Sequence, residues 1–197
     1  MAVQTATTTI AKGTRISRWA LGVLGTAFVL LAVALFVVEA GETQGAATSV
    51  SYGGGVRPNV GEKAPDFTAP DLSGNLVRLS DYQGRPVWIN FWGSWCPPCR
   101  AEMPEIDAAY REAQSSGLVL LAVSVGEDRD VVARYLRQTG FDIPAVLDAD
   151  GLVATQYAVT GFPTHVFVDR DGIVRDIRVG GLNLRSIRDR LATIVAQ

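Results

Sequence analysis

Apolar and polar residues alternate along the chain in short segments that predict an α/β domain. Two mainly apolar runs, residues 86–92 and 118–125, predict strands. The second has the composition of a strand covered on both faces, and we expect it in the middle of the sheet. Apolar residues at helical spacing predict helices at residues 100–114, 128–138 and 184–195. The remaining predicted elements are strands at residues 67–69, 76–79, 145–147, 166–168 and 173–179 and a short helix at residues 151–157.

The turns between these elements indicate how the strands pair. Asp171 and Gly172 separate the last two strands and are a strong hairpin signal, so we expect an antiparallel pair at the end of the chain. The polar residues 71–75 separate the first two strands, which predicts a β-hairpin ahead of the main domain. The fold class is therefore α/β, with a central mixed β-sheet flanked by helices and an N-terminal hairpin extension.

The beginning of the chain has the pattern of a membrane anchor. Residues 1–18 carry three basic residues and no acidic residue, and residues 19–38 contain no charge. Twenty helical residues span about 30 Å, the thickness of a bilayer core. The positive charge before this run predicts a cytoplasmic N-terminal tail, a transmembrane helix and an exported domain. A cleaved signal peptide is the alternative, although its apolar region usually spans only about 7–15 residues.

The rest of the chain is one domain on a linker. Residues 39–59 are rich in Gly, Ser and Thr and show no hydrophobic periodicity, which is typical of a flexible linker. Residues 60–197 form the predicted domain, and the 197-residue chain is 48% hydrophobic, enough to bury a core. The formal net charge is −2 and there is no basic cluster. We therefore expect a monomer that does not bind nucleic acid.

Cys96 and Cys99 are the only cysteines, so any disulfide within the chain must join them. They lie where a predicted strand passes into a predicted helix, and the free N–H groups of a helix start stabilise a thiolate. We therefore predict Cys96 as the nucleophile and Cys99, one turn later, as the resolving thiol. Pro97 and Pro98 suit the first helical turn, where a missing N–H costs least.

Trp-Cys-Pro-Pro-Cys at residues 95–99 resembles the active site of thioredoxin-like proteins. Pro104 resembles the proline that kinks the active-site helix of that family, and Gly-Phe-Pro-Thr at 161–164 resembles its cis-proline loop. Glu102 matches the acidic residue of the membrane-anchored ResA and TlpA type within the AhpC/TSA-redoxin superfamily. The resemblance covers residues 60–197 and implies a thioredoxin-like fold.

The resemblance also suggests roles for individual residues. Asn90 stands where thioredoxin has a buried aspartate, so Glu102 is the side chain left to accept the proton of Cys99. The alternative interpretation of Glu102 is a solvated residue near the helix start. A cis bond before Pro163 would turn the N–H and C=O of Phe162 outwards to pair with an extended substrate chain. Trp95 is expected to be exposed, where it could shield the disulfide or contact a substrate.

Three other residues have competing interpretations. His165 is the single histidine; a role beside the cysteines is one reading, and we favour a strand-end residue with an ordinary hydrogen bond. Two cysteines and one histidine are too few for a closed zinc site, so we expect no metal and no cofactor. Trp92 is expected in the core. Arg100 could favour the thiolate of the active site, but we interpret it as a surface residue.

Three function classes follow from these patterns. The resemblance implies an extracytoplasmic thiol-disulfide oxidoreductase that reduces disulfide-containing proteins, as in cytochrome c maturation on apocytochrome c, with electrons from a membrane donor of the CcdA or DsbD type. A thiol peroxidase of the peroxiredoxin type is an alternative, but peroxiredoxins have a threonine three residues before the reactive cysteine, where this chain has Gly93. The third is a binding module, such as a copper chaperone that uses the same thiols as ligands, or a domain whose disulfide is merely structural. Export suits an oxidant, whereas the two prolines and the resemblance favour a reductant.

Overall fold

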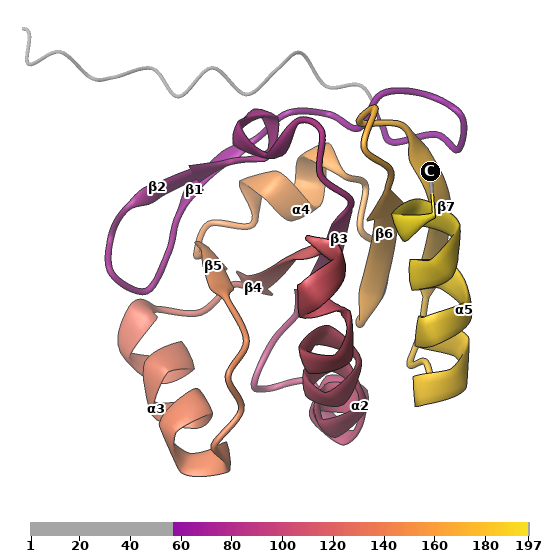
Figure 1. Cartoon of the computed structure of the whole chain (residues 1–197). Coiled ribbons are helices and arrows are strands. Elements are labelled where there is room, and N and C mark those ends of the chain that lie inside the picture. Colours follow the sequence, from indigo (N-terminus) through magenta and orange to yellow (C-terminus); the bar gives the residue numbers. More distant parts are fainter. Residues whose placement is uncertain (1–56, 197) are drawn as a thin grey trace, which may run out of the picture. The chain divides into compact units, whose positions relative to one another are not determined.

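The structure is a computed structural model that describes residues 57–196 (Figure 1). The predicted cytoplasmic tail, the predicted anchor and nearly all of the predicted linker lie outside the described residues. Among the helices that are described, none is both long enough and apolar enough to cross a membrane.

The central sheet has five strands in the order β5-β4-β3-β6-β7. β3 (Val87–Trp92), β4 (Val119–Val125) and β5 (Ala145–Asp148) are parallel, and their residues are all buried. β6 (Thr164–Val168) is antiparallel to β3, and β7 (Val174–Val179) is antiparallel to β6. The predicted mixed sheet and its terminal hairpin are therefore confirmed. β4 is an interior strand, next to β3 at the centre.

One face of the sheet carries α2 (Pro97–Ala113), α3 (Arg129–Thr139) and α5 (Leu184–Val195) (Figure 1). Gly140 caps α3 in the left-handed conformation, as predicted, and Asn183 accepts a hydrogen bond from the Ser186 N–H at the start of α5. Residues 114–116 extend α2 by a short 3-10 turn.

The other face of the sheet carries α4 (Leu152–Gln156) and the N-terminal hairpin, which is formed by β1 (Thr68–Pro70) and β2 (Leu76–Arg78). A 3-10 turn, Leu79–Tyr82, follows β2. Asp71 in the hairpin turn forms an isolated β-bridge with Val146 of β5. The predicted hairpin extension is therefore present and lies against the sheet.

Side chains of β3 alternate between two hydrophobic cores, as a strand covered on both faces requires. Trp88 and Trp92 join the core under α2 and α5, whereas Ile89 and Phe91 join the core under α4 and the hairpin. All four are fully buried, which confirms Trp92 as a core residue. Burial of a large side chain contributes about 1.5–3 kcal/mol, so these cores fix the end of β3 from which the active-site loop departs.

Most element bounds lie within one residue of the predicted ranges, and the starts of α2 and β6 lie two or three residues before the apolar patterns that indicate them. α2 begins at Pro97, with Pro97 and Pro98 in its first turn as predicted and Cys96 as its cap. The helix continues through Pro104. β6 begins at Thr164, two residues earlier than expected, which places His165 within the strand.

Candidate active site

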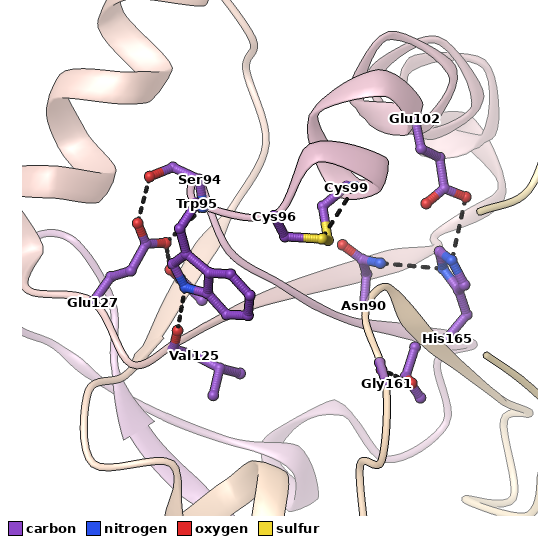
Figure 2. Close-up of a disulfide and its surroundings, with 12 residues drawn as sticks. Asn90, Ser94, Trp95, Cys96, Cys99, Glu102, Val125, Glu127, Gly161 and His165 are labelled. Carbon is purple, nitrogen blue, oxygen red and sulfur yellow. Dashed lines mark hydrogen bonds and ion pairs between the residues drawn. A yellow bond between two sulfur atoms is a disulfide. The ribbon is translucent and has the colours of Figure 1, made fainter. Parts of the chain in front are cut away.

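Cys96 and Cys99 form a disulfide at the start of α2, directly after the loop that leaves β3 (Figure 2). Cys96 is the N-cap residue, and its Sγ accepts a hydrogen bond of 3.3 Å from the backbone N–H of Cys99. The exposed fractions of the two residues are only 3% and 1%. A thiolate on Cys96 would receive the same N–H in a charge-assisted hydrogen bond, which is stronger than a neutral one.

The loop before the disulfide is held by Glu127, a residue that the sequence analysis did not identify. Glu127 is 6% exposed, and its Oε2 accepts hydrogen bonds of 2.8 Å from the Ser94 N–H and from the Ser124 hydroxyl. Its Oε1 accepts a further hydrogen bond from the Ser94 hydroxyl. The loop is therefore fixed to the end of β4 by a carboxylate.

Trp95 and Phe162 form an aromatic pair beside the disulfide. Trp95 is 53% exposed, as expected, and its Nε1 donates to the Val125 carbonyl over 3.1 Å. The Trp95 and Phe162 ring centroids are 5.1 Å apart in an edge-to-face arrangement, and Phe162 packs against the core cluster that contains both cysteines. The Phe162–Pro163 peptide bond is cis, as predicted. The outward backbone groups of Phe162 and its contact with a substrate stay predictions.

Glu102 is buried rather than solvated, with an exposed fraction of 4%. Its Oε1 accepts a hydrogen bond of 2.6 Å from the Leu182 N–H and lies 3.2 Å from Nε2 of His165. Its Oε2 is buried without a hydrogen bond. The interpretation of Glu102 as a solvated surface residue is therefore wrong, whereas its role as proton acceptor stays a prediction.

His165 is fully buried and belongs to a polar network that joins β3, β6 and α2 (Figure 2). Its Nδ1 lies 3.3 Å from the Trp88 Nε1 and 3.2 Å from the Asn90 Nδ2. Asn90 Oδ1 is buried without a hydrogen bond. The expectation of a strand-end histidine with one ordinary hydrogen bond is therefore too simple.

Arg100 is exposed on α2, in agreement with its interpretation as a surface residue. Its nearest electrostatic effect is on Tyr135 of α3: burial raises the pKa of Tyr135, and the Arg100 guanidinium lowers that pKa in part. The structure therefore assigns Arg100 no contact with the sulfur atoms.

Gly93 has no space for a side chain. A β-carbon at this position would lie 2.4 Å from Nε1 and 2.6 Å from Cε2 of Trp95, closer than real β-carbon contacts allow. The Trp95 ring cannot move away freely, because it packs on Phe162 and donates to Val125. The threonine that a peroxiredoxin places here would therefore displace Trp95.

Comparisons with known proteins agree with this geometry. Residues 60–177 match the AhpC/TSA family. The chain is 39% identical over 135 residues to the thiol-disulfide oxidoreductase ResA of Geobacillus thermodenitrificans, covering 68% of this chain and 78% of that protein. It is 35% identical over 134 residues to the ResA of Bacillus subtilis, covering 68% and 75%.

The fold also has a counterpart among solved structures. A thiol:disulfide interchange protein DsbE from Chlorobium tepidum superimposes with a TM-score of 0.65 at 29% sequence identity, over 70% of this chain and 99% of that one. The described domain is therefore thioredoxin-like. With its Cys-Pro-Pro-Cys pair capping α2, the chain belongs to the AhpC/TSA family and is a thiol-disulfide oxidoreductase of the ResA type.

Proposed function

We propose that this protein reduces disulfide bonds in other proteins outside the cytoplasm, with Cys96 as nucleophile and Cys99 as resolving thiol. The observation that carries the proposal is the hydrogen bond from the Cys99 N–H to the Cys96 Sγ at the start of α2. That N–H favours a thiolate at Cys96, and only a thiolate attacks a disulfide.

The proposed reaction moves two electrons and two protons to the substrate. The Cys96 thiolate attacks one sulfur of the substrate disulfide, which forms a mixed disulfide and releases one substrate thiolate. Cys99 then gives its proton to Glu102 Oε2 and attacks the Cys96 sulfur. This step closes the Cys96–Cys99 disulfide and releases the second substrate thiolate. The two thiolates take up one proton from Glu102 and one from water.

We place the substrate chain on the surface formed by Trp95 and Phe162. Trp95 is a large aromatic residue that is nevertheless exposed. A hydrogen bond to the Val125 carbonyl and a contact with the Phe162 ring hold it beside the disulfide. An extended segment could pair with the Phe162 backbone in the manner of an added strand. The Cys96 sulfur is nearly covered, so only a chain that reaches into this surface would meet it.

The location and partners follow from the same proposal. The charge-free residues 19–38 support a single membrane anchor with the catalytic domain outside the cell. A reductant there needs electrons from within, which favours a membrane donor of the CcdA or DsbD type. Apocytochrome c is the proposed substrate, because its maturation requires two reduced cysteines for haem attachment.

Substitution of each cysteine tests the proposal in the full-length chain. Cys96→Ser should abolish the reduction of insulin, because no nucleophile remains. Cys99→Ser should accumulate a mixed disulfide between Cys96 and the substrate, visible as a shift on a non-reducing gel that dithiothreitol reverses. Rapid alkylation of Cys99 with Cys96 inert would contradict the assignment.

The direction of electron flow needs a separate measurement. Equilibration of the Cys96–Cys99 pair with glutathione and with dithiothreitol gives its reduction potential. A potential near that of thioredoxin, about −270 mV, is expected for a reductant, whereas a value near that of DsbA, about −120 mV, would make the protein an oxidant.

A further inference from the structure

The network around His165 extends the function proposed above and rests on it. We propose that His165 is a positioning residue for Glu102. In its neutral form, with the hydrogen on Nε2, it holds Oε1 of Glu102 and so leaves Oε2 as the oxygen that takes the proton of Cys99.

The partners of Nδ1 determine which nitrogen of His165 carries the hydrogen. The indole Nε1 of Trp88 can only donate, and it points at Nδ1 over 3.3 Å. The amide nitrogen of Asn90 lies 3.2 Å from the same atom. A hydrogen on Nδ1 would face two N–H donors within a fully buried site. The neutral ring therefore accepts at Nδ1 and carries its hydrogen on Nε2.

The Nε2 hydrogen faces the carboxylate of Glu102. Nε2 lies 3.2 Å from Oε1 and makes no hydrogen bond in the disulfide state. The Leu182 N–H donates to the same oxygen over 2.6 Å. Oε1 thus accepts the Leu182 N–H and lies close to Nε2, whereas Oε2 has no hydrogen bond. The carboxylate is held by one oxygen, and the other keeps its capacity to accept a proton.

Asn90 links this pair to the disulfide. Its nitrogen is turned towards His165, and Figure 2 shows its oxygen on the side of the sulfur atoms. Oδ1 of Asn90 and Oε2 of Glu102 are both buried without a hydrogen bond. Reduction of the disulfide creates a thiol donor on Cys99, and we take Oε2 of Glu102, one of these two oxygens, as its acceptor. The disulfide state therefore leaves an acceptor oxygen free for the thiol hydrogen that Cys99 carries in the reduced state.

Charged residues of the neighbouring strand β7 pair with each other or with α5. Arg178 is opposite His165 in the register of β6 and β7, and its Nε binds Asp176 over 3.0 Å. Arg190 of α5 binds the same aspartate over 2.9 Å. Within the described chain, Glu102 is the acidic residue that lies within ion-pair distance of the ring.

In the proposed step His165 neither gains nor loses a proton. The S–H bond of Cys99 breaks and its proton forms a bond with Oε2 of Glu102. The sulfur electron pair forms the bond to Cys96, and the electrons of the mixed disulfide leave with the substrate sulfur. His165 acts only through the orientation of Glu102.

The tautomer can be measured directly, because the chain contains one histidine. The full-length protein, purified in mild detergent without a polyhistidine tag and labelled with ¹⁵N-histidine, gives two ring nitrogen signals. For the neutral ring we expect a protonated Nε2 and an unprotonated Nδ1 in both redox states. A ring protonated on Nδ1, or one that exchanges rapidly between both forms, would overturn the proposal.

Substitutions separate positioning from simple packing. His165→Phe removes the Nε2 donor and should slow the release of substrate from the mixed disulfide about tenfold. This loss is smaller than the full contribution of a positioned proton acceptor, because Glu102 itself remains. The same variant should also show a shifted pH dependence of that step. His165→Gln, which keeps a donor near the position of Nε2, should restore most of the rate. The matched control is Phe167→Leu, on the same face of β6 and stacked on Trp88, which should lower thermal stability but leave the pH dependence unchanged.

Combination with Glu102→Gln distinguishes the possible failures. If His165 acts through Glu102, then His165→Phe should have no further effect on the pH dependence in the Glu102→Gln background. A pH dependence that changes with Glu102→Gln but not with His165→Phe would overturn the role of His165 alone. If Glu102→Gln has no effect, the proton acceptor of the proposed function fails as well. Should His165→Phe not fold, His165→Gln and the tautomer measurement decide the question.

Discussion

Glu102 and Glu127 are both buried carboxylates beside the active-site loop, yet their surroundings differ (Figure 2). Both oxygens of Glu127 accept hydrogen bonds, from the backbone and hydroxyl of Ser94 and from the hydroxyl of Ser124. Only one oxygen of Glu102 does so. A fully bonded carboxylate fixes the atoms around it, whereas a buried oxygen without a partner can still accept a proton.

The donors also come from different parts of the fold. Those of Glu127 belong to the loop itself and to the end of β4, so this carboxylate joins two neighbouring segments. The Leu182 N–H that binds Glu102 comes from the segment before α5, and Nε2 of His165, which lies 3.2 Å from Oε1, comes from β6. We infer that Glu127 maintains the loop and that Glu102 serves the chemistry of the cysteines. The two substitutions below separate stability from catalysis on this basis.

Glu102→Gln should have the largest effect, and on turnover rather than on folding. A positioned proton acceptor contributes about 10²–10⁴-fold to a rate, and we expect a loss near the lower end, about 100-fold. The pH dependence of thiol alkylation should change in the same variant. Glutamine keeps an oxygen for the Leu182 N–H, so the urea unfolding midpoint should change little. Glu105→Gln, on the same helix, is the control. Equal losses of turnover in the two variants would contradict the catalytic role assigned to Glu102.

The position of the cysteines was predictable from the sequence because it depends on local signals. An apolar run, two prolines and a helical stripe place Cys96 at a helix start, and α5 has the predicted bounds at 184–195. The structure confirms Pro97 and Pro98 in the first turn of α2, although the amphipathic run itself begins only at Arg100. Local propensity thus identified the elements and the redox pair.

The roles of Glu127 and His165 could not be read from local pattern, because they depend on contacts between strands. Glu127 follows β4 as the cysteine loop follows β3, and the two strands are parallel, so their carboxyl ends lie at one edge of the sheet. The sequence therefore did contain a signal that Glu127 lies near the cysteine loop. The partners of His165 come from residues 75 and 77 positions away in sequence, and only the folded sheet brings them together.

Glu127→Ala should have the next largest effect, and here stability should change. Removal of the carboxylate leaves the Ser94 N–H and the Ser124 hydroxyl without their partner, which costs about 1–3 kcal/mol for each buried group left unsatisfied. Urea unfolding measures this loss. The pH dependence of thiol alkylation should keep its shape, since Glu102 is untouched. Glu127→Gln keeps one acceptor oxygen and should lose less stability than Glu127→Ala. If Glu127→Ala instead altered the pH dependence of thiol alkylation and left stability unchanged, the roles assigned to Glu102 and Glu127 would be reversed.

Asp148 extends the comparison to a third buried carboxylate and should show the smallest effect. Its Oδ1 and Oδ2 accept hydrogen bonds of 3.0 Å and 2.8 Å from the N–H groups of Val153 and Ala154 in α4. Burial nevertheless raises the pKa of Asp148 above its ordinary value of 3.8, and the two N–H groups offset this rise only in part. In the pH range just above 3.8 the folded state therefore holds a proton that the unfolded state has lost.

The sign of the pH dependence follows from that proton. As the pH rises through this range, the contribution of Asp148 to the free energy of unfolding falls, because deprotonation leaves a charge in a buried site. Asp148→Asn carries no such proton and loses one acceptor oxygen, at a cost of about 1 kcal/mol. Urea unfolding at a series of pH values should show that the wild type exceeds Asp148→Asn most at acidic pH and less near neutrality. A difference that instead grows as the pH rises would mean that the hydrogen bonds to the Asp148 carboxylate outweigh its burial, and Asp148 would then belong with Glu127 among the carboxylates that stabilise the fold in their charged form.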